Sequence, residues 1–239
     1  MAGHSEWSNK KYRKRRQDRK KAKKFASLVK EITSEARKNP DPEENPTLAS
    51  AIERAKEANM PKENIEKAIK RATGELESAN YQRLIYEGYG PYGLAVLVQV
   101  ETENKNRTST ELKNIFSRHG GELGENGCVK WMFDRKGEIE IDKANLNGTD
   151  SEQIQLEAIE KGAENIRENG EKIVIYCKPN DLKRLTEFLD KYCKKTDSRL
   201  TMIPANQVSW SGEKKEEALQ LIEELKEERD VEKVFTTLK

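Results

Sequence analysis

The spacing of apolar residues changes near residue 80, and this change limits the possible folds more than any other feature of the sequence. Before it, apolar residues recur every three or four positions, the period of an amphipathic helix. After it, apolar residues alternate or form short β-branched runs separated by helical segments, which is typical of α+β domains. A chain of 239 residues is also long enough for more than one core. We therefore expect a helical N-terminal unit followed by mixed α+β units.

Three helices are expected in the N-terminal unit. An apolar stripe that begins at Ala22 predicts a helix that stops before Pro40. Asn45 and the proline after it predict the start of a second helix, because asparagine caps and proline is tolerated in the first turn. A third helix is expected to begin at Pro61 and to end before Gly74. Their apolar faces are narrow and rich in alanine, so we expect this unit to need support from the rest of the chain.

The segment after residue 80 begins with the pattern β-α-β. Residues 94–100 are a continuous apolar run, which predicts a buried strand. Thr108 and Glu111 have the spacing of a capping box, which predicts the start of a helix. Val129, Trp131 and Phe133 recur at every second position and predict a second strand.

A second series of elements lies inside the first. Residues 138–203 predict the order β-α-β-β-α-β, which is the ferredoxin-like order. A short strand near Val208, a helix and a strand at 234–235 would then complete the interrupted first series. The expected fold class is α+β with three domains, a small helical domain plus two ferredoxin-like two-layer α/β sandwich domains, one inserted in the other. Their bounds are 1–80 for the basic arm and helical domain, 81–134 plus 204–239 for the discontinuous α+β domain, and 135–203 for the inserted domain.

Positive charge is concentrated at the N-terminus. Residues 1–38 carry 14 Lys and Arg against four acidic residues, a net charge of +10, so the rest of the chain carries −8 of the overall +2. A polyanion is the natural partner of such a segment, and the acidic remainder would repel nucleic acid elsewhere. We expect an arm up to about Arg19, followed by helical turns anchored by Phe25. The rings of Trp7 and Tyr12 in the arm are suited to stacking on bases. The predicted nucleic-acid-binding residues are His4, Trp7, Lys10, Lys11, Tyr12, Arg13, Lys14, Arg15, Arg16, Arg19, Lys20, Lys21, Lys23 and Lys24.

A second, weaker binding site is expected at Lys105, Asn106 and Arg107. These residues lead into a helix N-terminus, where free N–H groups favour anions. Ordinary helix capping is an equal alternative for this turn. For the N-terminal segment, the alternatives are a solubilising arm and a localisation signal.

The sequence contains no strong pattern for an enzyme. Gly88, Gly90 and Gly93 satisfy G-x-G-x-x-G, but a strand follows where a dinucleotide site requires a helix, so a hairpin or interdomain turn is favoured. His119 is expected to be a structural cap at a helix end. The carboxylates between residues 213 and 232 are expected to form a solvated helix face. No catalytic residue, cofactor, metal or small-molecule substrate is therefore expected.

The cysteines indicate a reducing compartment. Cys128, Cys177 and Cys193 are odd in number and form no C-x-x-C pair, which favours free thiols. The two histidines are not spaced with them as zinc ligands. The sequence also lacks a run of roughly 18 apolar residues and a signal peptide, so a cytoplasmic protein without a membrane partner is expected.

Four stretches of the sequence resemble the YebC family. They are MAGHSEW with the basic run after it, ANMPKENIEKAIKRATGE at 58–75, YEGYGP at 86–91, and NKNRT followed by FSRHGGELGENGCV at 116–129. The resemblance covers nearly the whole chain. It implies three domains, one helical and two α+β, with no enzymatic activity and no required cofactor.

The sequence departs from the family pattern at four positions. Glu6 stands where Lys is usual, Lys10 where an apolar residue is usual, Tyr12 where His is usual, and Tyr92 where Gly is usual. Lys10 restores the charge that Glu6 removes, so electrostatic binding is expected to survive. Tyr12 keeps a ring for stacking but loses the titratable group.

The resemblance also implies a role in gene expression. Relatives are described as probable transcriptional regulators that bind DNA, and others, including a mitochondrial translational activator of cytochrome oxidase, act on translation. The expected function is a non-enzymatic, nucleic-acid-binding regulator of the YebC type that binds DNA through the basic N-terminal arm. The alternative is a translation factor that binds the ribosome and rRNA and assists proline-rich synthesis. The expected partner is thus DNA or rRNA.

Overall fold

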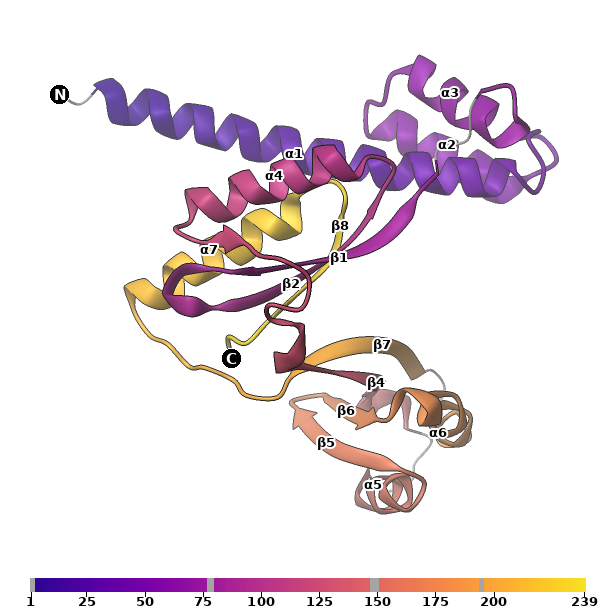
Figure 1. Cartoon of the computed structure of the whole chain (residues 1–239). Coiled ribbons are helices and arrows are strands. Elements are labelled where there is room, and N and C mark those ends of the chain that lie inside the picture. The colour runs from indigo at the N-terminus through magenta and orange to yellow at the C-terminus, as the bar shows by residue number, and fades with distance from the viewer. Residues whose placement is uncertain (1–2, 77–79, 147–150, 194–195) are drawn as a thin grey trace. The chain divides into compact units, whose positions relative to one another are not determined.

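The computed structural model describes residues 3–76, 80–146, 151–193 and 196–239 (Figure 1). The chain divides into two compact units, which we call unit 1 (Met1–Val129 with Ser209–Lys239) and unit 2 (Lys130–Val208). Unit 2 spans the predicted insertion at 135–203. The separation of residues 1–80 as a domain of their own stays a prediction.

The helical part of unit 1 consists of α1 (Gly3–Ala36), α2 (Pro46–Glu57) and α3 (Lys62–Thr73). Asn45 caps α2 by accepting a hydrogen bond from the backbone N–H of Leu48, and Gly74 ends α3 with a φ of 82°. Both helix ends are confirmed. The three helices share one core, formed by Leu28, Ile32, Ala36, Leu48, Ala51, Ala55, Met60, Ile65 and Ala68.

The basic N-terminal segment is helical throughout. The expectation of an arm followed by a helix from Ala22 was wrong, because α1 is one helix of 34 residues that begins at Gly3. Apolar spacing reveals this helix only from Phe25 onward, since the preceding basic half has no apolar stripe. Lys and Arg nevertheless favour helix, which explains the continuous backbone. The first turns of α1 extend away from the rest of unit 1 (Figure 1).

The sheet of unit 1, sheet A, has four antiparallel strands in the order β3-β1-β2-β8. Its strands are β1 (Gln82–Tyr89), β2 (Ala95–Thr102), β3 (Glu122–Leu123) and β8 (Val231–Thr236). α4 (Lys105–Arg118) and α7 (Glu213–Glu227) pack against the same side of β2 in one core. The C-terminal tail therefore returns to this sheet, as the sequence predicted.

Several details of unit 1 differ from the sequence predictions. β1 was not predicted, because only part of its surface is buried and its apolar alternation is weak. The capping box was wrong: α4 begins at Lys105 with Asn104 as its cap, and Thr108 lies buried within the helix. The strand expected at 129–133 is a 3₁₀ turn until Phe133. Val208 forms an isolated bridge and belongs to no strand of sheet A.

Unit 2 has the ferredoxin-like order predicted for residues 138–203. Its elements are β4 (Phe133–Asp142), α5 (Ser151–Glu160), β5 (Ala163–Asn169), β6 (Lys172–Cys177), α6 (Leu182–Leu189) and β7 (Thr196–Pro204). The strands form an antiparallel sheet, sheet B, in the order β5-β6-β4-β7. Sheet A of unit 1 has the same number of strands, but the chain enters this sheet through the β1–β2 hairpin, so the order of its elements differs. The α+β fold class is confirmed.

Short 3₁₀ helices complete the described chain. They are η1 (Pro91–Gly93), η2 (Lys130–Met132), η3 (Lys143–Asn145) and η4 (Pro179–Asp181). η1 joins β1 to β2, which confirms the hairpin interpretation of the glycine motif. A Cβ on Gly90 would lie 2.5 Å from Leu221 Cδ2, and one on Gly121 would lie 2.4 Å from the carbonyl oxygen of Tyr89. Gly90 and Gly121 thus permit close packing, whereas Gly93 permits a φ of 76° in the turn. Over the described ranges, the helices are all too short or too polar to cross a membrane.

Candidate nucleic-acid interface

Residues 3–24 of α1, which we call its N-terminal half, carry all fourteen residues of the main predicted interface. The structure describes the side chains of Lys14, Arg19, Lys20, Lys21, Lys23 and Lys24. The side chains of the other eight lie outside the described part of the chain, although their backbone is helical. They are His4, Trp7, Lys10, Lys11, Tyr12, Arg13, Arg15 and Arg16.

One side of this half-helix is attached to the end of α7. Lys23 Nζ donates a hydrogen bond to the carbonyl oxygen of Val231 at 2.7 Å and another to the carbonyl oxygen of Lys226. The second carbonyl belongs to the last turn of α7, where the helix dipole favours a cation. Burial lowers the pKa of Lys23, and the nearby Glu228 opposes that effect. Lys23 therefore acts as an anchor within the protein.

Arg19 belongs to a second anchor, centred on Glu224 of α7. Glu224 is 6% exposed and pairs with Arg19 and with Arg118 Nη2, the latter at 2.6 Å. His119 Nε2 lies 2.5 Å from Glu224 Oε2. Burial alone raises the pKa of Glu224, but the hydrogen bonds from His119, Arg19 and Arg118 outweigh it and lower the pKa to about 2. The carboxylate thus stays charged and fixes α1 to α4 and α7.

Glu224 corrects the expectation that the acidic residues of 213–232 are all solvated. Its position between Leu221 and Leu225, both fully buried, places it at the apolar face of α7. That spacing is the signal that the sequence contains for this site. Its partner His119 is the C-cap of α4, so the predicted capping role is confirmed.

The other side of the half-helix is open. Lys14, Lys21 and Lys24 are exposed, and Lys20, whose Nζ lies 3.3 Å from Glu227 Oε1, is 59% exposed. Lys14 and Lys21 are seven residues apart and Lys24 follows after three, so the three lie toward one side of the helix. Cations on this side are available to an anion from solvent.

At the second predicted site, one of the two cations, Arg107, is already paired within the protein. Arg107 Nη2 lies 2.9 Å from Asp230 Oδ2, while the Asn104 side chain accepts a hydrogen bond from the backbone N–H of Arg107. Asp230 also accepts hydrogen bonds from Thr102 and Thr108. Burial alone raises the pKa of Asp230, but the hydrogen bonds from Arg107 and Thr108 outweigh it and lower the pKa. The guanidinium group of Arg107 and one N–H group of the helix N-terminus are therefore already bonded within the protein. Lys105 and Asn106 remain exposed.

The described residues show neither a group of side chains suited to bind a metal ion nor a cysteine with an activated thiol. Among them, no group of three or more His, Cys, Asp or Glu side chains is placed to hold a metal ion. The three cysteines are free thiols, as predicted. Burial raises the pKa of all three, which lowers the fraction of reactive thiolate.

Comparison with known proteins agrees with the motifs noted above. A family profile described as "TACO1/YebC protein N-terminal domain" matches residues 5–75, and one described as "TACO1/YebC second and third domain" matches residues 81–238. A probable transcriptional regulatory protein of Natranaerobius thermophilus is 46% identical over 237 residues, covering 98% of this chain and 95% of that protein.

Two further proteins extend the comparison. A protein of Thermotoga maritima with the same description is 44% identical over 237 residues, covering 99% of this chain and 93% of its own. A crystal structure of a conserved hypothetical protein from Aquifex aeolicus has a TM-score of 0.62 and 40% identity, covering 90% of this chain and 88% of that one.

Proposed function

The chain belongs to the TACO1/YebC family, and from this membership we propose that it is a regulator of gene expression that binds DNA through the N-terminal half of α1. Relatives that are 44–46% identical over nearly the whole chain are described as probable transcriptional regulatory proteins, which supports the regulatory role. The observation that carries the DNA-binding part is the set of exposed lysines, Lys14, Lys21 and Lys24, on a helix that is fixed to the protein by its other side. The proposal involves binding only, without a catalytic step.

A single basic helix suits duplex DNA in size and charge. An α-helix with its side chains is about 10–12 Å across, close to the width of the major groove. Residues 10–24 contain eleven Lys and Arg against Asp18, so the segment can neutralise several phosphates. Attachment through Lys23 and Arg19 holds the helix before DNA arrives, which reduces the ordering entropy of binding.

The sheet of unit 2 is less suited to a polyanion. Glu138 and Glu140 lie side by side on one face of the central strand β4. Arg199 pairs with both of them, and Glu140 also pairs with Lys172. A phosphate approaching this face would meet carboxylates whose neighbouring cations are already paired. This supports α1 as the main contact.

A charge-matched pair of triple variants tests the proposal. Lys14→Ala, Lys21→Ala, Lys24→Ala removes three cations from the open side of α1. Lys178→Ala, Lys183→Ala, Lys191→Ala removes three exposed cations from unit 2 and serves as control. Affinity for a duplex of defined sequence is measured by fluorescence anisotropy over a series of salt concentrations. The first triple should lose most of its affinity, and its log K against log salt slope should fall by up to about 2.7, since each duplex phosphate contributes about 0.9.

The same titration separates the competing interpretations. Equal losses in the two triples would contradict a specific role of α1, because net charge alone would then explain the effect. A parallel titration with single-stranded RNA of equal length compares the two polymers. Tighter binding to RNA with the α1 triple still impaired would refute DNA as the target while leaving the helix as the binding surface.

A further inference from the structure

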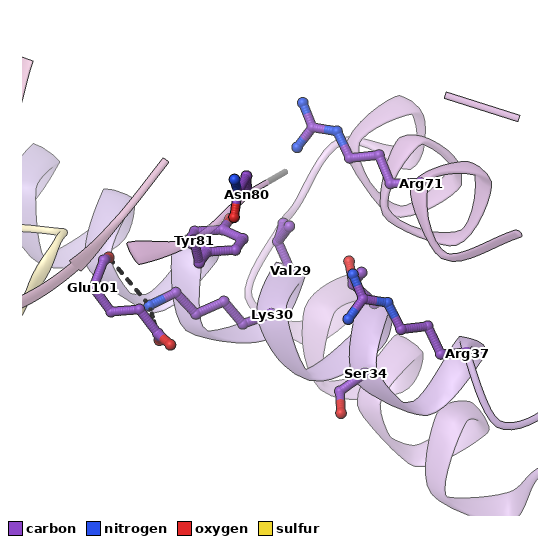
Figure 2. A pocket seen from close by; sticks show the side chains of 9 residues that line it. Val29, Lys30, Ser34, Arg37, Arg71, Asn80, Tyr81 and Glu101 are labelled. Carbon is purple, nitrogen blue, oxygen red and sulfur yellow. Dashed lines mark hydrogen bonds and ion pairs between the residues drawn. The ribbon is translucent and has the colours of Figure 1, made fainter. Parts of the chain in front are cut away.

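A cavity of about 470 Å³ lies in unit 1 away from the N-terminal half of α1. Its lining, labelled in Figure 2, comes from the C-terminal part of α1 and the residue after it, from α3, from Asn80 and Tyr81 just before β1, and from the end of β2. This volume lies within the usual range of ligand sites. The lining residues used below are Lys30, Ser34, Arg37, Arg71, Tyr81 and Glu101.

Two arginines give this cavity a positive charge. Lys30 Nζ lies 2.7 Å from Glu101 Oε2, and its hydrogen bond lowers the pKa of Glu101, so these two charges cancel. Arg37 and Arg71 remain, one directly after the end of α1 and one from α3, with their guanidinium groups on the cavity wall (Figure 2). Two guanidinium groups with planar N–H donors suit an anion with several oxygens, such as a phosphate.

The uncharged part of the cavity wall adds a hydroxyl donor, Ser34, and an aromatic ring, Tyr81. Ser34 is exposed on the cavity side of α1, whereas the Thr33 hydroxyl is already used by the carbonyl oxygen of Ala68. The Tyr81 ring is partly buried, and Lys30 Nζ lies 5.0 Å from its centroid. The ring thus lines the same cavity as the two arginines. A sugar attached to the phosphate can pack against it.

We propose that this cavity binds one phosphate group of the nucleic-acid backbone between Arg37 and Arg71, with the attached sugar against Tyr81. This inference rests on the proposed function and adds a second contact to it. Arg37 follows Arg19 by about five turns of helix, so the cavity lies on the side of α1 that carries Arg19 and Lys23 and about 140° around the helix from Lys14. The cavity therefore binds a part of the polymer that bends around α1 from its open side.

The test compares two double variants that remove equal charge. Arg37→Gln, Arg71→Gln removes the cavity arginines, and Lys67→Gln, Lys70→Gln removes two exposed cations of α3 that do not line the cavity. With a 24-base-pair duplex that carries a flexible 30-nucleotide single-stranded extension, the arginine variant should lose at least fivefold in affinity and about 0.7 in salt slope, the value for one phosphate of a single strand. The lysine variant should lose less than twofold. Equal effects in both variants would refute the proposal.

A direct measurement uses the wild-type chain and small probes. The Nε–H resonances of Arg37 and Arg71 are followed by NMR while inorganic phosphate or a thymidine dinucleotide is added. Both probes should shift both resonances, and the dinucleotide should bind more tightly, an advantage that Tyr81→Ala should remove. Unshifted resonances at saturating dinucleotide would overturn the proposal.

The two hypotheses fail in distinguishable ways. If the α1 triple variant weakens duplex binding and the cavity variant does not, only the cavity proposal falls. If the α1 triple variant binds as the wild type does, the proposed function falls, whatever the cavity variant shows.

Discussion

Lys23 of α1 donates a hydrogen bond through Nζ to the carbonyl oxygen of Val231, 2.7 Å away and 208 residues later in the sequence. The same ammonium group reaches the carbonyl oxygen of Lys226 at the end of α7. Lys24, the next residue, is exposed. Two adjacent lysines of one basic run therefore have different roles, one in holding the helix and one in contact with solvent.

Substitution of these two lysines should separate stability from binding. Lys23→Met leaves two carbonyl groups without their donor, so we expect a loss of about 1–3 kcal/mol in the free energy of unfolding and faster amide hydrogen exchange in α1. Lys24→Met should change the unfolding free energy by less than about 0.5 kcal/mol and should reduce the salt slope of DNA binding. Urea unfolding, hydrogen exchange and anisotropy provide the measurements. Identical behaviour of the two variants would contradict the anchoring role.

Removal of the charge at Glu224 should destabilise unit 1. Glu224→Gln keeps the shape of the side chain but leaves Arg19 and Arg118 without their carboxylate. Loss of one partner of a buried ion pair lowers the free energy of unfolding by about 3–5 kcal/mol. We expect a decrease of about 3 kcal/mol here, because Arg118 is 43% exposed. Urea unfolding at neutral pH measures the effect. The control is Glu66→Gln, which removes an exposed i,i+4 pair with Lys62 and should cost about 0.5 kcal/mol or less.

Stability should also fall in acid through Glu224. Its pKa is about 2 in the folded state against an ordinary value of 4.5, so the folded chain binds fewer protons than the unfolded chain between these values. The stabilisation is therefore complete above about pH 4.5 and is lost as the pH falls toward 2. Asp230, whose pKa is also lowered, contributes with the same sign. Unfolding free energies at pH 6 and pH 3 should differ less in Glu224→Gln than in the wild type, and an unchanged difference would contradict this assignment.

Two threonines of α4 provide a matched test of the buried network around Asp230. Thr108 is fully buried and donates to Asp230 Oδ2 at 2.7 Å, so Thr108→Val should cost about 1–3 kcal/mol in unfolding free energy. Thr110 is exposed and bonds only to the carbonyl oxygen of Asn106 among the described contacts. Thr110→Val should therefore change stability by less than about 0.5 kcal/mol. Thermal unfolding of both variants measures the difference.

Close backbone packing should make Gly121 intolerant of a side chain. A Cβ there would lie 2.4 Å from the carbonyl oxygen of Tyr89 and 2.9 Å from Gly90 Cα, and both neighbours are backbone atoms. Gly121→Ala should cost about 1–3 kcal/mol through forced backbone shifts. Gly74→Asn is the control, because nothing lies within 4 Å of its Cβ and asparagine tolerates the left-handed conformation. A small effect at Gly121 would show that the β1–β2 hairpin can move away from the turn at Gly120 and Gly121, which would contradict this prediction.

Much of the fold follows from local chemistry. The ends of α2 and α3 depend on Asn45 and Gly74, whose preferences act within one helical turn. The ferredoxin-like order of unit 2 follows from the apolar periods of its elements, which are strong because one face of each is buried. β1 and the first half of α1 were not predicted, since β1 is only partly buried and the basic half of α1 has no apolar stripe.

The candidate site depends on contacts that local patterns do not contain. Charge counting identified the basic segment, because a net charge of +10 in residues 1–38 is a property of the sequence itself. It could not distinguish Arg19 and Lys23 from the lysines beside them. That distinction arises where α1 meets α7, since successive residues of a helix point about 100° apart and only one side of α1 faces Glu224 and Val231. The sequence alone thus determined that the N-terminus is basic, and the tertiary structure decided which of its cations hold the helix and which face solvent.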